Sequence, residues 1–507
     1  MKNYIFFLLL FCSYHSVSQD VDLSKIDQYI ENAVKDWDAP GLSVAIVKDG
    51  KIVHEKGYGQ LEKGKKNQPD EHTLYAIASN TKAFTSAIIA QLVEEGKLGW
   101  DDPVQRYLPY FEIYDTQISS LVTVRDLLSH RTGLGTFHGD VTWYRSDFKG
   151  EEIIRNIKHI KQSYPFRSGY GYSNLMFITA GELIEKVSGK SWEVNVQSRL
   201  LDPVGMSRTI TTVQDLDKKG NYATPHIYRD EKHTPTQWVG WDNVKSTGGL
   251  ISSVHDIGNW LIANMNDGII EGDTLFSIES RNQMWKPHAN ITRDHVKLNS
   301  TKSHFSAYGL GWFLGDYDGN FHVRHGGGYD GMISAVHMLP DHNLGVVVLT
   351  NGVKVPTNAI SYYIFDRYLN KPIHDWSSEM LENADNFYKR DADQIQKLRD
   401  SKVKNAPATF NKSDILGKYH TDTYGDIEVK EEENNLIIDF TRSPHLKAKL
   451  KHFNYDIFEI IWEHDQPWFS FGTVQFTKTN RNKVKGIEFD VPNYDFFFEE
   501  LNAKRID

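Results

Sequence analysis

Apolar residues change their spacing several times along the first two thirds of the chain. Residues 22–38 carry them at helical intervals, and residues 42–54 form two β-rich runs joined by Asp49-Gly50, a strong hairpin signal. Helical stretches alternate with glycine-rich and aromatic loops over 100–240. Four strand candidates joined by short turns follow at 308–314, 321–324, 333–339 and 344–350. Since short turns indicate antiparallel neighbours, we predict an α+β domain with one antiparallel sheet flanked by helices and a helical subdomain.

The pattern changes after residue 375. Residues 376–408 are charged and poor in apolar residues, and they contain Ala406-Pro407-Ala408, so we expect a charged linker between domains at 19–375 and 409–507. The second domain consists almost entirely of short strand-like runs with polar turns, among them Trp468–Phe471. Such a series predicts a small antiparallel barrel or sandwich.

The N-terminus has the features of a secretory signal at residues 1–18. A basic start precedes an apolar run at 5–12 that is too short to span a bilayer, and small residues stand at Ser16-Val17-Ser18. We therefore expect a periplasmic or secreted protein. A lipid anchor on Cys12 is the less favoured alternative, because bulky Phe11 stands where lipoprotein processing expects a small residue. Removal of Cys12, the only cysteine, leaves no disulfide and no thiolate metal site.

Composition narrows the classes of function. The 507 residues, 39% of them apolar, suffice for two hydrophobic cores. A net charge of −10 argues against nucleic acid as a partner. No segment after the N-terminus approaches 18 uninterrupted apolar residues, so we predict no membrane span. The 21 histidines include no His-Glu-x-x-His, and we predict neither a metal site nor an organic cofactor.

A serine and a lysine lie one helical turn apart at the start of an apolar helix. At this spacing Ser79 and Lys82 share one helix face, where a lysine of lowered pKa can take the serine proton. Chance gives about two Ser-x-x-Lys matches in a chain of this length, and the sequence holds three. Those at 146–149 and 401–404 lie in irregular or charged segments. The helix after Ser79 repeats apolar residues at Phe84, Ile88 and Leu92. This context selects Ser79 as the candidate nucleophile.

Tyr172-Ser173-Asn174 lies in a loop that enters the helical run 175–187. A tyrosine there can relay a proton to or from a serine oxygen, and the asparagine amide oxygen can accept a hydrogen bond from a lysine. The structural alternative is an asparagine helix cap beside a core tyrosine. Tyr368-Leu369-Asn370 shows that the same spacing also arises by chance.

The run from His325 to Gly331 is rich in glycine. Its glycines match the G-x-G-x-x-G dinucleotide fingerprint, but another strand follows where that motif needs a helix, so we reject a Rossmann site. Glycines on a strand let a ligand approach the backbone, whose N–H groups can stabilise an oxyanion. The alternative is a structural glycine turn. No Gly-x-Ser-x-Gly elbow is present, which argues against an α/β-hydrolase.

Together, Ser79-x-x-Lys82, Tyr172-x-Asn174 and His325-x-Gly327 resemble, in this order, the motifs of the serine β-lactamase and penicillin-binding protein superfamily, in its class C-like branch. The resemblance covers roughly residues 22–370. Further segments similar to that family lie at 124–134, 172–189, 201–206 and 247–253. The last domain resembles the lipocalin-like barrels appended to some members.

The resemblance implies a role for each motif residue. Ser79 would be acylated, Lys82 would help to deprotonate it, Asn174 would hold the lysine, and Tyr172 would shuttle protons. The oxyanion hole would be formed by the backbone N–H groups of Ser79 and Gly328.

The third motif departs from the penicillin-recognising members of the family. They carry Lys-Thr-Gly or Lys-Ser-Gly where this chain has His325-Gly326-Gly327, and a neutral histidine with glycine is a weaker anion clamp. This version resembles esterases and D-aminopeptidases. His130 has the setting of a structural histidine at a helix end.

From these features we expect an exported serine hydrolase with a small-molecule, ester or peptide substrate. It would act on an ester, amide or peptide bond and be a poor β-lactamase. The alternative is a penicillin-binding sensor without turnover, or a scaffold that binds a cell-envelope component or polysaccharide.

Overall fold

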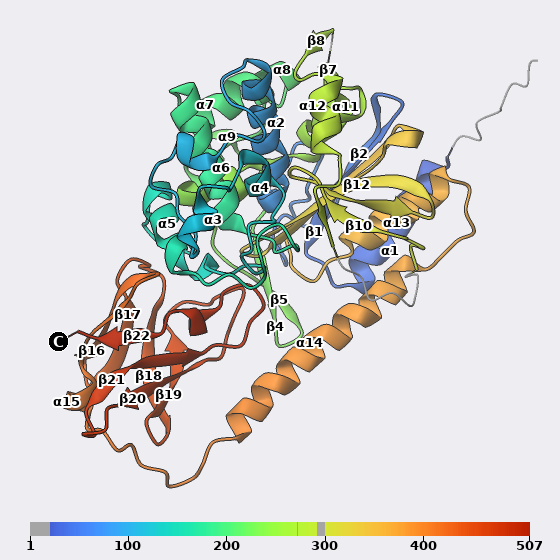
Figure 1. Ribbon diagram of the computed structural model, residues 1–507. Helices are drawn as coiled ribbons and strands as arrows, with labels where there is room; N and C mark the ends of the chain where they lie inside the picture. Colours follow the sequence, from blue (N-terminus) through green and yellow to red (C-terminus); the bar gives the residue numbers. More distant parts are fainter. Residues whose placement is uncertain (1–20, 271, 292–299, 507) are drawn as a thin grey trace, which may run out of the picture.

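The computed structural model describes residues 21–270, 272–291 and 300–506, which form a mixed α/β N-terminal domain and a C-terminal barrel (Figure 1). The signal expected at residues 1–18, with Cys12, lies outside the described residues. In the part of the chain that is described, no helix has the length and apolar character needed to cross a bilayer.

The N-terminal domain is built on one antiparallel sheet of eight strands, in the order β2-β1-β14-β13-β12-β11-β10-β9. The strands are β1 (Gly41–Lys48), β2 (Lys51–Gly59), β9 (Ala289–Asn290), β10 (Ser306–Tyr308), β11 (Phe313–Tyr317), β12 (Asn320–Tyr329), β13 (Met332–Leu339) and β14 (Leu344–Thr350). The predicted hairpin at 42–54 is confirmed by β1 and β2, and the antiparallel sheet by the pairing of β11 to β14.

Both faces of the sheet are covered, because alternate residues of its strands belong to different cores. Val44 and Ile46 of β1 pack toward helices α1 (Leu23–Asp36) and α13 (Thr357–Tyr368). Ala45 and Val47 point to the other face, which is covered by α2 (Thr81–Glu94) and α11 (Val254–Met265). This period of two is the pattern of a strand buried on both sides.

The helical subdomain lies beside α2 and above the barrel (Figure 1). Its elements are α3 (Thr116–Ser119), α4 (Val124–Leu128), α5 (Gly150–Asn156), α6 (Asn174–Ser188), α7 (Trp192–Val196), α8 (Asp202–Val204), α9 (Leu216–Lys219), α10 (Lys245–Gly248) and α12 (Ile278–Met284). Short strand pairs connect these parts: β3 (Tyr75–Ala76) with β6 (Ile251–Ser252), β4 (His226–Arg229) with β5 (Lys232–Pro235), and β7 (Ile269–Ile270) with β8 (Asp273–Thr274).

One strand of the sheet was placed wrongly by the sequence pattern. The run 308–314 is not a single strand, because β10 ends at Tyr308 and β11 begins at Phe313. The four residues between them form a turn, in which Gly309 donates to the Trp312 carbonyl and Gly311 has φ +78°. Glycine tolerates that backbone conformation, and a glycine-rich strand run can therefore be a hairpin turn.

The C-terminal domain is a closed antiparallel barrel of eight strands. They are β15 (Gly417–Thr421), β16 (Gly425–Glu432), β17 (Asn435–Phe440), β18 (Lys447–Asn454), β19 (Ile457–Trp462), β20 (Thr473–Lys478), β21 (Val484–Asp490) and β22 (Ala503–Arg505). Aromatic rings, including those of Phe440, Phe489 and Phe498, pack against one another inside it. The predicted strand at Trp468–Phe471 is wrong: this segment belongs to the loop from β19 to β20.

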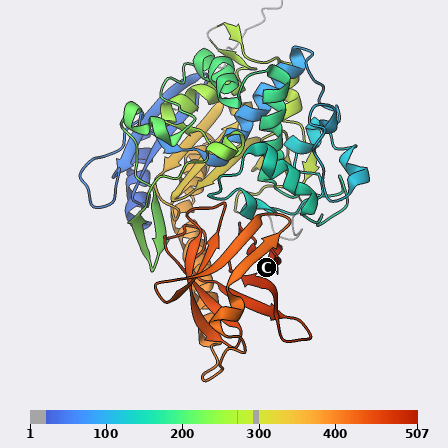
Figure 2. The ribbon, with the colours of Figure 1, turned by 90° about the vertical axis from the view of Figure 1, so that its left-hand side faces the viewer.

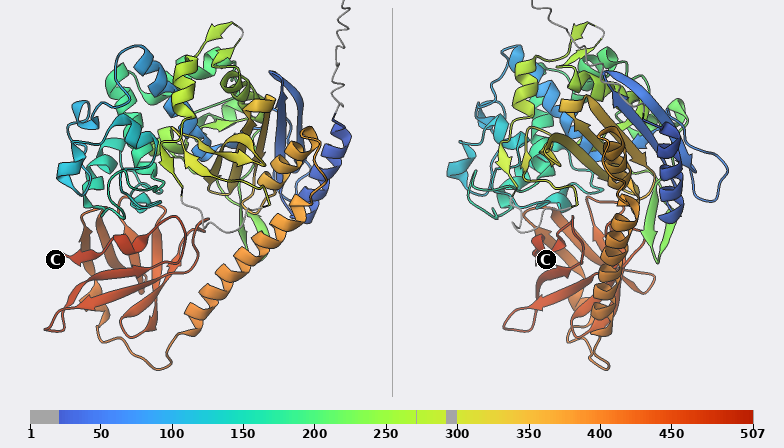
Figure 3. Two further views of the ribbon diagram at one scale, coloured as in Figure 1. Left: turned by 45° about the vertical axis from the view of Figure 1, so that its right-hand side comes forward. Right: turned by 90° about the vertical axis from the view of Figure 1, so that its right-hand side faces the viewer.

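The segment 376–408, expected to be a charged linker, contains a long helix, α14 (Trp376–Asp400). The Asp375 side chain caps it by accepting a hydrogen bond from the Ser378 backbone N–H. Figures 2 and 3 show α14 running from the N-terminal domain along the side of the barrel. The chain turns back after α14, and the barrel that follows lies beneath the helical subdomain. The barrel is therefore in contact with the rest of the molecule.

Candidate active site

Ser79 lies on a tight turn just before α2, in the 3₁₀ segment Ala78–Asn80. Ala78 has φ +45°, a left-handed conformation that costs an alanine about 1 kcal/mol or more. Hydrogen bonds from β13 hold this turn, since the Ser334 hydroxyl donates to the Ile77 carbonyl (2.7 Å) and accepts from Asn80 Nδ2 (2.8 Å). The predicted helix is present, and the strained turn before it presents the half-buried Ser79 at its end.

Lys82 is fully buried and has three oxygen neighbours. Its Nζ lies 3.0 Å from Ser79 Oγ, 2.8 Å from Asn174 Oδ1 and 2.9 Å from the Thr247 carbonyl oxygen. Burial holds the pKa of Lys82 well below its ordinary value, and the charge of Asp140 opposes that shift. A neutral amine has two hydrogens, which the amide and carbonyl oxygens accept, and its lone pair then faces the Ser79 hydroxyl. This geometry suits a general base.

Tyr172 lies at the entrance to α6 and is 7% exposed. Lys82 Nζ is 4.9 Å from the centre of its ring. Burial raises the pKa of Tyr172 far above its ordinary value, and the nearby Ser79 hydroxyl opposes that rise. The phenol therefore keeps its proton near neutral pH, so it can donate that proton only if it receives another from a neighbour.

Asn174, the first residue of α6, connects Lys82 to a buried carboxyl group. Its Oδ1 accepts from Lys82 and from the Thr247 hydroxyl (3.1 Å), and its Nδ2 donates to Asp140 Oδ2 (2.6 Å). Burial raises the pKa of Asp140 to about 8. Sequence reasoning missed the roles of both residues: Asp140 belongs to no recognised motif, and Thr247, which begins the family-like segment 247–253, contacts Lys82 through its backbone carbonyl.

His130 supports the turn that carries Tyr172 and Asn174. It is fully buried with φ +57°, and its Nδ1 accepts a hydrogen bond from the Ser173 backbone N–H (3.1 Å). Burial holds its pKa well below the ordinary value, so the ring is neutral. These contacts agree with the structural role expected for this residue.

His325 has both ring nitrogens engaged within the protein. Its Nδ1 lies 2.6 Å from the Gly326 carbonyl, which can only accept, so Nδ1 carries the hydrogen and Nε2 accepts from the Tyr308 hydroxyl (2.9 Å). Burial lowers the pKa of His325 to about 3. A neutral imidazole with both nitrogens satisfied offers no charge to a substrate carboxylate.

Gly327 lets β12 approach the turn of Ser79. A Cβ atom there would lie 2.2 Å from the Ile77 carbonyl oxygen and 3.1 Å from the Ala78 side chain, so only glycine fits. The pairing of β11 with β12 ends at Arg324, and within the described chain the segment 325–329 pairs with β13 alone. The backbone around Gly328 therefore has an open edge beside Ser79, as an oxyanion hole requires.

The structure thus brings Ser79, Lys82, Tyr172 and Asn174 into one cluster, with β12 and its glycines against it. Over the described residues, no group of three or more His, Cys, Asp or Glu side chains is placed to hold a metal ion.

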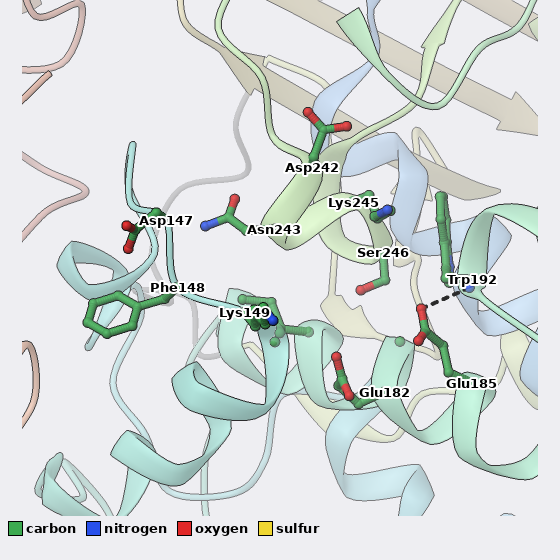
Figure 4. Close-up of a pocket in the computed structure, with 13 residues that line it drawn as sticks. Asp147, Phe148, Lys149, Glu182, Glu185, Trp192, Asp242, Asn243, Lys245 and Ser246 are labelled. Carbon is green, nitrogen blue, oxygen red and sulfur yellow. Dashed lines mark hydrogen bonds between the residues drawn. The ribbon is translucent and has the colours of Figure 1, made fainter. Parts of the chain in front are cut away.

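A separate cavity of about 300 Å³ lies between α5, α6 and α10, and none of its lining residues belongs to this cluster (Figure 4). Glu182 and Glu185 project toward it, and burial raises the pKa of Glu182 to about 7. Ser246 of its wall precedes Thr247, whose carbonyl accepts from Lys82.

Comparison with known proteins gives matches for both domains. Residues 26–368 match the family model described as beta-lactamase, and residues 401–505 match a domain of unknown function, DUF3471. The chain is 29% identical over 406 residues to "Unguisins hydrolase ungD'" of Aspergillus campestris, which covers 76% of this chain and 72% of that protein. It is 28% identical over 340 residues to "Protein flp" of Staphylococcus aureus, covering 64% of this chain and 62% of that protein.

Solved structures share the fold. The octameric penicillin-binding protein homologue from Pyrococcus abyssi is 22% identical with a TM-score of 0.62, over 93% of this chain and 99% of that chain. A penicillin-binding protein from Bacillus halodurans is 22% identical with a TM-score of 0.52, over 64% of this chain and 94% of that chain. These likenesses confirm the predicted fold class, an α+β domain followed by a barrel.

Proposed function

Because the chain belongs to the beta-lactamase family, we propose that this serine hydrolase is exported and cleaves an ester, amide or peptide bond through an acyl-enzyme on Ser79. The observation that supports this most is the position of the Lys82 amine. Two of its three neighbours can only accept hydrogen bonds, so in its neutral form it turns its lone pair to Ser79 Oγ.

Acylation then needs one proton transfer in each direction. Lys82 takes the proton of Ser79 while Oγ forms a bond to the substrate carbonyl carbon, and the carbonyl oxygen gains negative charge. The backbone N–H groups of Ser79 and Gly328 donate to that oxyanion. When the bond to the leaving group breaks, Tyr172 gives its proton to the departing atom and regains one from Lys82.

Deacylation repeats the steps with water as the nucleophile. Water loses a proton toward Tyr172 and Lys82, its oxygen bonds to the acyl carbon, and Ser79 Oγ leaves with the returned proton. The acid product departs and the free serine is restored. Besides the cluster, this cycle uses the backbone N–H of Gly328.

The surroundings of His325 favour substrates without a carboxylate next to the scissile bond. Penicillins carry such a carboxylate, and a buried neutral histidine engaged with Tyr308 and Gly326 supplies no charge to hold it. We therefore propose that esters or D-amino-acid amides are better substrates than β-lactams.

A comparison of three chromogenic substrates tests the proposal. A nitrophenyl ester, a D-amino-acid anilide and a cephalosporin are given to the wild type and to Ser79→Ala. We expect turnover of the ester or the anilide to exceed that of the cephalosporin, and Ser79→Ala to abolish it. Unchanged turnover in Ser79→Ala would falsify the proposal, and a stable adduct without product release would show a sensor instead of an enzyme.

A further inference from the structure

One loop of the barrel reaches the strand that borders the candidate active site. Trp468, in the loop from β19 to β20, lies against Gly328 of β12: a Cβ atom on that glycine would be only 3.0 Å from Trp468 Cη2. Gly328 is half-buried and its neighbour Gly326 is exposed. The indole therefore packs on β12 at the residue expected to complete the oxyanion hole, on the strand face opposite to the one on which Gly327 meets the Ser79 turn.

The loop is anchored to the N-terminal domain. The Arg229 guanidinium of β4 donates to the backbone carbonyls of Gln466 (2.8 Å) and Phe469 (3.3 Å), on both sides of Trp468. These carbonyls are thereby satisfied outside the barrel ladder, which explains why the segment is not a strand. The anchoring also fixes the ring in place before any ligand binds.

A second barrel segment contacts the loop 137–140, which in turn binds Tyr172 and Asn174. Glu500 accepts from the Gly139 backbone N–H (2.8 Å), and its other oxygen lies 2.7 Å from His138 Nδ1. On either side of these two residues, Phe137 N donates to the Tyr172 carbonyl (2.8 Å) and Asp140 binds Asn174.

Aromatic contacts extend this interface. Phe496 packs against Tyr144, with ring centres 4.1 Å apart, and against Trp143 at 5.7 Å. Two loops of the barrel therefore touch the N-terminal domain, one at β12 and one at residues 138–144.

The barrel interior offers less to a ligand than this interface does. Rings of Phe440, Phe489 and Phe498 fill it with centres 5.7 to 6.3 Å apart. By contrast, the Trp468 indole N–H is enclosed and has no acceptor among the described residues. The indole N–H of Trp462, in the barrel, also has no acceptor among the described residues, so the feature that distinguishes Trp468 is its position against Gly328.

We propose that the barrel completes the active site, and that Trp468 is a specificity-determining residue which contacts the apolar group of the substrate that runs along β12 from the reacting carbonyl. The inference rests on the proposed function at Ser79. It makes the last domain part of the substrate-binding surface instead of a separate ligand-binding module. The substrate class that fits is an ester or amide with an extended apolar acyl or alcohol group, because an indole offers a large flat apolar face.

Two pairs of esters test this proposal. One pair differs in the acyl group (nitrophenyl acetate and octanoate), the other in the alcohol (methyl and octyl acetate), and kcat/KM is measured for wild type, Trp468→Ala and Trp468→Phe. We expect Trp468→Ala to lower the long-to-short ratio at least ten-fold in one pair, because the long chain loses its contact. Trp468→Phe, which keeps a ring, should change that ratio less than three-fold.

Controls separate this inference from the proposed function and from misfolding. Tyr455→Ala removes a barrel aromatic that is 53% exposed, and it should leave both ratios unchanged. Labelling of Ser79 by a fluorophosphonate shows that each variant is folded and active. If wild type and Trp468→Ala both label and turn over with the same ratios in both pairs, the role of Trp468 is overturned while the proposed function stands. If the wild type neither labels nor hydrolyses any ester, the proposed function fails.

Discussion

The cluster around Lys82 and the interior of the barrel are both buried, but the first is built from hydrogen-bonded polar groups and the second from apolar rings. In the cluster, Lys82 and Asp140 are buried, and each lies within hydrogen-bond distance of the Asn174 side chain. In the barrel, alternate strand positions fill the space with apolar rings. Burial of apolar rings stabilises the barrel, whereas burial of ionisable groups shifts their pKa values and can make them reactive.

Removing the base should have the largest effect. We expect Lys82→Ala to lower kcat/KM for a nitrophenyl ester by about 10³-fold or more, since no other buried amine reaches Ser79 Oγ in the described structure. Lys82→Arg should not rescue activity, because a guanidinium stays protonated. Steady-state kinetics on folded protein, checked by circular dichroism, decides this. Activity within ten-fold of wild type in either variant would exclude Lys82 as the base.

The second-largest effect on activity is expected from adding a single methyl group to β12. Gly327→Ala places a Cβ against the Ile77 carbonyl and must push the strand away from the Ser79 turn. We expect kcat/KM to fall by at least ten-fold and stability to fall by about 1–3 kcal/mol, as is usual for overpacking. Gly425→Ala is a useful contrast for stability, because that glycine begins β16 of the barrel with φ +97° and an added Cβ would meet nothing within 4 Å. Gly425→Ala should lower stability while leaving kcat/KM unchanged, and equal losses of kcat/KM in both variants would contradict the account.

The buried Asp140 should set part of the pH profile. Its negative charge raises the pKa of Lys82, and its own pKa is raised to about 8. Activity requires neutral Lys82 and so increases as pH rises through the lysine pKa. Asp140 is therefore charged only above about pH 8, so Asp140→Asn should raise kcat/KM relative to wild type there and leave the profile at lower pH unchanged. Profiles that coincide over the whole pH range would show that Asp140 does not act on Lys82.

The smallest effect is expected at the interface between the domains. The hydrogen bond to Glu500 raises the pKa of His138 in the folded protein. Such a group stabilises the folded state at low pH, and this contribution is lost as the pH rises through the pKa that the group has in the folded state. Glu500→Gln should therefore destabilise most at acid pH, and the difference from wild type should shrink as the histidine deprotonates. Because the pair is partly exposed, we expect less than about 1 kcal/mol. Denaturant unfolding at several pH values measures it, and a difference that grows with pH would refute the assignment.

The two regions also differ in how far the sequence predicted them. Ser79 and Lys82 were found because their spacing on a helix fixes which side chains meet, whereas Tyr172 and Asn174 were linked to them by the resemblance to the family's order of motifs. Asp140 was missed because its contact with Asn174 depends on how a loop folds back, and Thr247 because it acts through its backbone.

The barrel strands were predicted from alternation, but the loop with Trp468 was taken for a strand. Trp468 faces the N-terminal domain, whereas Phe469 and Phe471 pack on rings of the barrel. A period of two in the sequence does not distinguish such a loop from a barrel strand. The same ambiguity made Tyr308–Leu314 look like one strand where glycines form a turn. The sequence pattern did not reveal helix α14, because this segment is charged and poor in apolar residues, although many of its residues are good helix formers.

The central claim is that Ser79 is the residue that becomes acylated. Wild type and Ser79→Ala are treated with a fluorophosphonate, and the modified peptide is located by mass spectrometry. The account predicts one covalent adduct on the peptide that contains Ser79 and none in Ser79→Ala. An adduct on another residue, or equal labelling of both proteins, would contradict it.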